Sequence, residues 1–430
     1  MVGSASIQPA HLFLMFLAFA TLSHWQKFGI ALKALAFPQP GFWFACLLVY
    51  GAATGLFSPR LFAGTMEIIP LGVSEYPASD SGTVPLGPVS SNLTQVIYLT
   101  ADLFCFLLII AVGSTRSGIQ AIAAGLVGYG FANTAFALLD LATYATGSQD
   151  LLQFIRNAQY AMHEDVVVGG LKRIVGSWPE ASAFAGSTLG VIGFTGTMWL
   201  CGRSAGWTGL LCLASIVLTA RSTSSVGILA LPLCLLLLYG TAIARSGLNK
   251  SSRNSSAVVL FTPPIVIAVA LIVILSETIY AWVYDYLDLL IFSKTTSASA
   301  MERGSWNMHA YENFLASSGL GVGLGTNRTS NFLLALLSNV GVPGTTFFFL
   351  FAISALSKRR GTPRDYASDV RLSARNGCLC LLVGSMVAGA TVDLGLQFFI
   401  LAGLACCVPQ PEGQRSQSIS TDLTSVARET

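Results

Sequence analysis

Three residues in a long polar stretch are spaced so that one helix face would bring together three kinds of chemistry. Arg303, Trp306 and His309 follow one another at intervals of three, and residues three apart lie on the same side of an α-helix. A guanidinium binds phosphate oxygens, an indole ring stacks on a sugar, and an imidazole transfers protons near neutral pH. We therefore expect a phosphate- and sugar-binding face here. An inert surface histidine is the other interpretation of His309.

Two further arginines lie in polar segments beside apolar runs. Arg221 stands in a short polar turn, residues 220–225, between two such runs. A charge beside a membrane helix is costly and usually has a partner, for which a lipid-linked phosphate is suited. The alternative is that Arg221 binds no phosphate and only extends its guanidinium to the membrane surface. Arg173, in another polar segment, is a third candidate for holding phosphate.

A carboxylate follows Arg173 at the start of the next apolar run. Glu180 ends the turn Trp178-Pro179-Glu180. Tryptophan favours the headgroup level of a membrane, which would put this carboxylate at the boundary between water and lipid. There it could act as a general base. Its alternative role is to complement the dipole of the helix that follows.

A glycine-rich stretch, residues 319–325, follows the arginine–tryptophan–histidine face. Backbone without side chains, as at Gly323 and Gly325, allows a ligand to approach closely. No Gly-Lys-Ser/Thr follows it, and no dinucleotide fingerprint occurs elsewhere. Nothing in the sequence therefore supports a nucleotide-driven mechanism.

No cofactor or metal is expected from the other polar and sulfur side chains. His163, Glu164 and Asp165 are adjacent in sequence and do not share a face. The nine cysteines all lie in or at the ends of apolar runs, where they are expected as small packing residues. Neither a zinc site nor a disulfide framework is predicted.

The composition indicates which elements position these residues. Of 430 residues, 53% are hydrophobic and only 10% are charged, whereas a soluble domain carries about 25% charged residues. Apolar runs of membrane-spanning length recur along the chain and do not alternate in polarity. Because lipid cannot pair with backbone polar groups, the runs should be helices. We expect an all-α polytopic membrane protein, with membrane lipid as a partner; nothing points to nucleic acid.

We expect about eleven membrane helices in one domain, residues 1–408. A polar tail, 409–430, is expected to be disordered and cytoplasmic. The first run has no basic leader, so we expect it to be retained. The expected helices are, approximately, 10–24, 41–57, 93–113, 119–145, 186–201, 207–219, 226–243, 257–282, 330–356, 377–391 and 395–408.

The distribution of positive charge predicts sidedness. Connections with lysine and arginine near the ends of membrane helices usually lie in the cytoplasm. Residues 357–375 form the most basic connection and are therefore expected there. Counting helices from there puts the short basic connections 114–118, 202–206 and 244–256 on the same side. The connections 58–92, 146–185, 220–225 and 283–328 then face outwards, the last as a large loop before helix nine. Two passes within 10–36 would instead put the N-terminus in the cytoplasm.

Three local patterns together resemble the O-antigen polymerase and ligase superfamily of bacterial glycan polymerases and ligases. The first is Arg173-x-x-Gly176-x-x-x-Glu180-Ala-Ser182, and the second is Leu218-Thr-Ala-Arg221-Ser222. The third joins Arg303-x-x-Trp306, Gly321-x-Gly323-x-Gly325, Ser330-Asn331 and Gly341-x-x-Gly344. Their order, spacing and expected side agree with those of the family, over roughly residues 150–355.

The resemblance implies a glycosyltransferase of the outer face of the bacterial inner membrane, with its active site facing the periplasm. Its substrate would be an undecaprenyl-diphosphate-linked oligosaccharide, transferred to a growing glycan chain without metal or nucleotide. Ligases of the group carry a histidine before the asparagine where this chain has Ser330. The chain is therefore more similar to an exopolysaccharide repeat-unit polymerase of the Wzy type, with an O-antigen-type ligase as the alternative.

The resemblance also implies roles for the residues above. Arg221 and Arg303, with Arg173, would clamp the diphosphate, and Glu180 or His309 would deprotonate the acceptor hydroxyl. Chain-length regulator and export proteins are further expected partners. Substrate contacts would come from Arg173, Trp306, Gly323, Gly325, Ser330 and Asn331.

Two other classes stay open, a flippase or exporter of lipid-linked glycans and a non-catalytic assembly subunit. A transporter needs charges within its membrane helices or repeated halves. No repeat is evident. The few acidic residues in the spans, Asp102, Asp140 and Glu277, are expected near helix ends.

Overall fold

The computed structural model describes residues 9–80, 82–156, 166–246, 252–288, 298–358 and 362–409, with Phe292 and Arg360. Within them the protein is mostly helical, which confirms the expected all-α class. The α-helices are α1 (Pro9–Leu22), α2 (Trp25–Ala34), α3 (Pro40–Leu61), α4 (Ser90–Val112), α5 (Arg116–Thr146), α6 (Ala181–Leu200), α7 (Ala205–Arg221), α8 (Ser225–Ser246), α9 (Arg253–Leu275), α10 (Glu277–Leu287), α11 (Ala298–Ala316), α12 (Phe332–Leu356), α13 (Tyr366–Ala388) and α14 (Leu396–Cys406).

The remaining regular structure is short. A 3₁₀ helix covers Gln149–Leu152, and two antiparallel pairs are formed by β1 (Glu67–Ile68) with β2 (Val84–Pro85) and by β3 (Val167–Val168) with β4 (Leu171–Lys172). After the 3₁₀ helix, residues 153–156 are not helical, and 157–165 lie outside the described residues. The expected tail also lies outside them, apart from Pro409.

Eight helices of the described chain are long and apolar enough to cross a membrane: α3, α4, α5, α6, α8, α9, α12 and α13. Three shorter apolar helices, α1, α7 and α14, correspond to three more of the expected runs. Every expected run coincides with helical structure. One run, 257–282, is divided at Ser276, whose backbone is extended (φ −106°, ψ 105°) and whose side chain accepts a hydrogen bond from the N–H of Ile279. This serine caps α10 and so ends α9.

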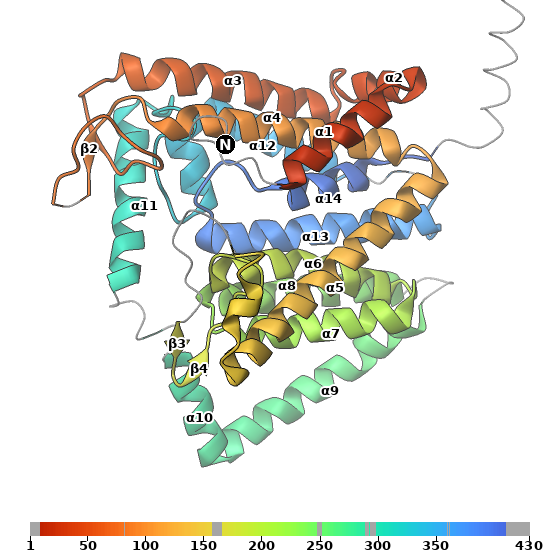
Figure 1. The fold of residues 1–430 in the computed structure, drawn as a ribbon. Coiled ribbons are helices and arrows are strands. Elements are labelled where there is room, and N and C mark those ends of the chain that lie inside the picture. Colours follow the sequence, from red (N-terminus) through yellow and green to blue (C-terminus); the bar gives the residue numbers. More distant parts are fainter. Residues whose placement is uncertain are drawn as a thin grey trace, which may run out of the picture.

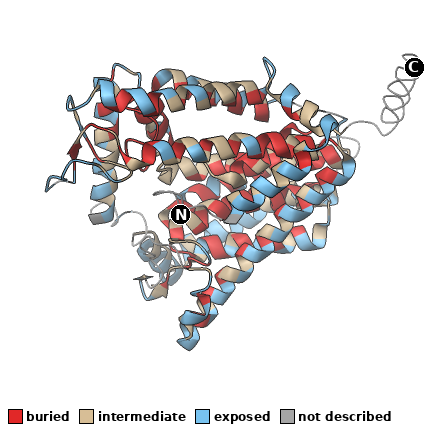
Figure 2. Ribbon diagram, turned by 45° about the horizontal axis from the view of Figure 1, so that its top comes forward, coloured by how far each residue is buried: buried red, intermediate tan, exposed pale blue. Residues whose placement is uncertain are grey.

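Helix α6 lies at the centre of the bundle and is buried along nearly all of its length. Small residues allow this, because they let neighbouring backbones approach closely. A Cβ at Gly193 would lie 2.6 Å from the Asn376 carbonyl oxygen of α13, and one at Gly196 would lie 2.8 Å from Leu238 of α8. Figure 2 shows the buried residues concentrated within the bundle. By contrast, α9 has only Ser255 buried, as expected for a helix that faces lipid.

The connections gather at the two ends of the bundle (Figure 1). At one, the loop end, lie β1–β4, α10, α11 and the glycine-rich stretch. Its segments bind one another: the N–H of Leu71 donates to the Thr326 carbonyl (3.0 Å), and the Tyr286 hydroxyl donates to the Ala220 carbonyl (3.0 Å). The four connections expected on the outer side thus contact one another.

The short basic connections meet at the opposite end, the basic end. Asp369 of α13 pairs with Arg203 (2.8 Å) and with Arg245 (2.9 Å), and Arg116 lies 3.6 Å from Asp365. The segment 357–375, expected as a loop, is helical from Tyr366 onward. The reason is that Asp369 is buried among these arginines and fixes the first turn of α13 against α6 and α8.

Candidate functional site

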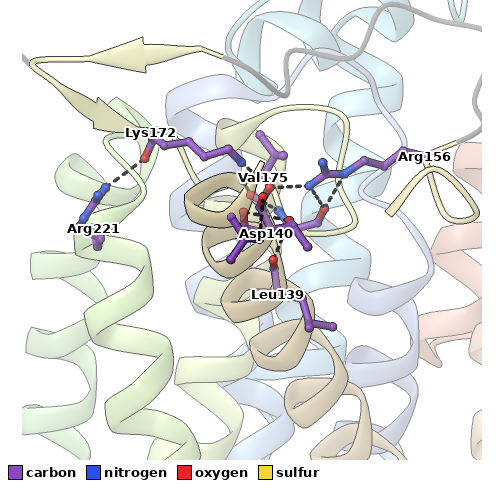
Figure 3. A network of polar contacts seen from close by, with 9 residues as sticks. Leu139, Asp140, Arg156, Lys172, Val175 and Arg221 are labelled. Atoms are coloured by element: carbon purple, nitrogen blue, oxygen red, sulfur yellow. Dashed lines mark hydrogen bonds and ion pairs between the residues drawn. The ribbon is translucent and has the colours of Figure 1, made fainter. Parts of the chain in front are cut away.

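A buried charge network holds the connection between α5 and α6 in place (Figure 3). Asp140 of α5 accepts hydrogen bonds from Arg156 (2.6 Å), from Lys172, and from the backbone N–H groups of Val175 (2.9 Å) and Gly176 (3.1 Å). All three charged side chains are almost completely buried. Because removing one partner leaves uncompensated charge, such a network is worth about 3–5 kcal/mol to break. Asp140 therefore fixes the loop that carries Arg173 and Glu180.

The same loop delivers Glu180 to the start of α6. The indole N–H of Trp178 donates to Asn133 of α5 (3.0 Å), which positions the Trp178-Pro179-Glu180 turn against the bundle. Glu180 is the N-cap residue of α6, and the Ser182 hydroxyl donates to its carboxylate. The turn expected from the sequence is thus present, with Glu180 half-buried beside the helix N-terminus.

Arg173 interacts electrostatically with both Glu180 and Arg303 at the loop end, although Arg303 is far along the chain. Burial lowers the pKa of the Arg173 guanidinium, the Glu180 carboxylate opposes this shift, and the positive charge of Arg303 adds to it. The Nε atom of Arg173 is buried and has no hydrogen-bond partner among the described residues. Two guanidinium groups beside one carboxylate leave net positive charge, which suits an anionic ligand.

Arg221 is the last residue of α7. Its guanidinium donates a hydrogen bond to the backbone carbonyl of Lys172 (3.0 Å), and Lys172 directly precedes Arg173. Burial raises the pKa of the Tyr286 hydroxyl, and the charge of Arg221 opposes that shift. Arg221 therefore lies among loop-end groups, where it bonds to the end of β4, the strand that precedes Arg173.

A cavity of about 820 Å³ lies between the helices, and Glu180 is one of its lining residues. Its volume is within the range of ligand pockets, about 300–1,000 Å³. Most of its wall is apolar, from α1, α4, α5, α6, α13 and α14. The polar side chains in the wall are His11, Tyr98, Asp102, Tyr129, Trp178, Glu180, Ser182, Ser187, Ser385, Asp393 and Gln397.

Helix α11 carries the arginine–tryptophan–histidine face across the loop end. Arg303, Trp306 and His309 are all half-buried, while their neighbours Glu302, Gly304, Ser305 and Met308 are exposed. The guanidinium of Arg328 lies over the Trp306 ring, 4.6 Å from its centre. The His309 ring lies 3.6 Å from Glu312 on the same helix. Of this face, Arg303 interacts electrostatically with Arg173.

The glycine-rich stretch packs against helices. A Cβ at Gly323 would lie 2.9 Å from Pro59 of α3, and one at Gly325 would lie 2.8 Å from Gln95 of α4. Protein atoms therefore lie close to both glycines on the side where a Cβ would stand; their contact with substrate stays a prediction.

Ser330 and Asn331 likewise have partners within the chain. The N–H of Ser330 donates to Asn307 (2.8 Å), and Asn331 caps α12 and donates to the Met386 carbonyl (2.7 Å). Their contact with substrate stays a prediction.

Several site residues were missed by reading the sequence. Asp102, expected near a helix end, is in fact in the middle of α4 and lines the cavity. Asp393, which the sequence analysis did not single out, lies on the non-helical segment between α13 and α14 and lines the cavity. A lone acid inside an apolar run was the available signal for Asp102. No sequence signal pairs Arg328 with Trp306.

Comparisons with protein-family models, with curated proteins and with solved structures find no match for this chain. All nine cysteines are described, and each is a free thiol. The described residues contain no group of three or more His, Cys, Asp or Glu side chains arranged to hold a metal ion. Fold and site together define a mostly helical membrane protein with a cationic cluster beside an apolar cavity.

Proposed function

We propose that this protein is a polytopic membrane glycosyltransferase that polymerises exopolysaccharide repeat units from undecaprenyl-diphosphate-linked oligosaccharide. One observation carries the proposal: Glu180 lines an apolar cavity of about 820 Å³ and interacts electrostatically with Arg173, which Arg303 also influences. A lipid-linked diphosphate has a matching form, with an anionic group between a sugar and a long apolar chain. A soluble sugar nucleotide would not need the cavity.

The chemistry follows from the positions of the charged groups. Arg173 and Arg303, aided by Arg221, would bind the diphosphate and stabilise the charge that develops as it leaves. The bond from the sugar anomeric carbon to the phosphate oxygen breaks, and a bond to the acceptor oxygen forms. The acceptor proton passes to a base. Glu180 is favoured over His309, because Glu180 lines the cavity and interacts with Arg173.

The proposed arrangement in the membrane uses about eleven crossings, the eight long helices and three shorter ones. The basic end would face the cytoplasm, since positively charged connections favour that side. The loop end, with the arginine cluster, would then face the periplasm of a bacterial inner membrane. The loop before α12 would cover the site from that side.

The direct test is Arg303→Ala in the producing cell. The variant should lose polymer while its protein level and its single lipid-linked repeat units remain. Arg60→Ala is the matched control, because Arg60 is an exposed arginine in the last turn of α3 and, among the described residues, bonds only within its own helix. Normal polymer in the Arg303 variant would refute the assignment.

A flippase or exporter of the same lipid-linked glycan is the second candidate. It is favoured by one observation, the acidic residues Asp102 and Asp393 in the wall of a cavity within the helices.

Analysis of lipid-linked oligosaccharides in a deletion strain separates the polymerase, flippase, assembly-subunit and ligase classes. Single units should accumulate outside for a polymerase and inside for a flippase, whereas a strain lacking an assembly subunit would retain some polymer. If the deletion strain still makes the polymer but no longer attaches it to another lipid, the protein would be a ligase.

A further inference from the structure

An acidic side chain lies deep in the bundle without a partner for one of its oxygens. Asp102 is the thirteenth residue of the 23-residue α4, about 18 Å from its start at a rise of about 1.5 Å per residue. It is only 1% exposed, and its Oδ2 atom has no hydrogen-bond partner among the described residues. It also lines the cavity. A buried, unsatisfied polar atom in a cavity wall needs an explanation.

A second carboxyl group reaches the same place from a break between two helices. Helix α13 ends at Ala388, α14 begins at Leu396, and the segment between them is not helical. Such backbone is tolerated at membrane depth only where it is buried in protein or lines a cavity. Asp393 of this segment lines the cavity, interacts electrostatically with Asp102, and accepts a hydrogen bond from the N–H of Gly395 (2.5 Å).

No lysine or arginine is present among the described residues of the cavity wall. The titratable groups that face the two acids are His11 of α1, Tyr98 and Cys105 of α4, and Tyr129 of α5; Glu180, before α6, lines the same cavity. His11 stacks on Tyr98 with ring centres 5.3 Å apart, and its Nδ1 atom is buried without a partner among the described residues.

Two carboxylates without a cation cannot both be ionised in apolar surroundings. We propose that Asp102 and Asp393 form a proton-binding pair in the cavity wall, and that filling the cavity with an apolar chain is coupled to the uptake of one proton. When the cavity holds water, the pair can release a proton to it. When an apolar chain displaces that water, the ionised form loses its solvation, and the pair takes a proton back from solvent. The inference rests on the lipid-binding part of the proposed function and not on glycosyl transfer.

The proposal determines how the affinity for the apolar chain depends on pH. Because the bound chain favours the protonated pair, the affinity of the protein for the chain should be highest at low pH. It should fall as pH rises through the titration of the pair. The limiting slope for one coupled proton is about a tenfold loss of affinity per pH unit. Calorimetry in two buffers of different ionisation enthalpy should report up to one proton taken up on binding.

A long-chain polyprenol is the probe, because it has no phosphate and cannot engage the arginines. Its affinity for the purified full-length protein is measured from about pH 5 to pH 9. The wild type should show the falling affinity, whereas Asp102→Asn/Asp393→Asn should bind with the same affinity throughout. Asp393→Asn alone is the second variant; it should also remove the slope, because an isolated, fully buried Asp102 stays neutral.

Two controls identify the groups responsible. Asp285→Asn, on the exposed surface of α10, should keep the wild-type slope. His11→Gln should keep it too; loss of the slope in that variant alone would assign the proton to the imidazole and overturn the proposal. Equal slopes in the wild type and in a correctly folded double variant, or no polyprenol binding at all, would also overturn it. These outcomes are independent of the Arg303→Ala test, which reports on glycosyl transfer only.

Discussion

If the protein is the glycosyltransferase proposed above, Glu180 and His309 are the two candidates for its base. The structure gives them different surroundings. Glu180 borders the cavity, accepts a hydrogen bond from Ser182 and interacts with Arg173, whereas His309 lies beside Glu312 on α11. A base must lie within hydrogen-bond reach of the proton it removes. At the residue scale, Glu180 therefore has the better geometry.

The choice can be tested with purified protein and lipid-linked repeat units. Glu180→Gln keeps an acceptor for Ser182 but loses the base, so its polymerisation rate should fall about 10²–10⁴-fold with binding of the lipid-linked unit little changed. His309→Gln should retain most of the activity. The reverse pattern, an active Glu180 variant and an inactive His309 variant, would transfer the role to the histidine.

At the scale of elements, a break within α12 joins the glycine-rich stretch to the bundle. Gly341 has φ 62° and ψ −168°, a conformation almost restricted to glycine. A Cβ there would lie 2.3 Å from the Leu320 carbonyl carbon and 2.4 Å from the Gly319 carbonyl oxygen. The N–H of Val342 also donates to Gly319 (2.8 Å). The kink lets the stretch pack directly on α12.

Gly341→Ala should therefore destabilise the protein by about 1–3 kcal/mol from backbone strain, with the clash adding to this loss. The measurement is thermal unfolding in detergent. Gly304→Ala is the matched control, since a Cβ at Gly304 on α11 meets nothing within 4 Å and alanine favours a helix. A Gly341 variant as stable as the control would contradict this account of the kink.

At the scale of the whole molecule, the two ends differ in chemistry. The loop end carries Arg173, Glu180 and Arg303, and the basic end carries the Arg203–Asp369–Arg245 group. The positive-inside rule predicts which end faces the cytoplasm.

Cysteine labelling tests that orientation. Ala78 at the loop end and Ser357 at the basic end are exposed, and eight of the nine native thiols are buried. In spheroplasts, a membrane-impermeant maleimide should label Ala78→Cys directly and Ser357→Cys only after lysis, with the wild type as background. Labelling in the opposite order would invert the topology and exclude a periplasmic site.

Much of the fold could be predicted because lipid imposes a simple rule. Backbone groups in an apolar run must pair within the run, so each of the eleven runs coincides with helical structure, and the turn ending at Glu180 lies where expected. The helical face of Arg303, Trp306 and His309 also follows from spacing alone. These features depend on residues that are neighbours in the sequence.

The candidate site depends on contacts between residues far apart in the chain. Arg303 approaches Arg173, and Asp393 faces Asp102, only after α11 and the segment before α14 have packed against the bundle. Periodicity reports which face of a helix is polar, not which other helix that face meets. The sequence by itself therefore determined a helical membrane protein with polar residues at its ends. The tertiary structure decided which charges share a site, because that depends on long-range packing.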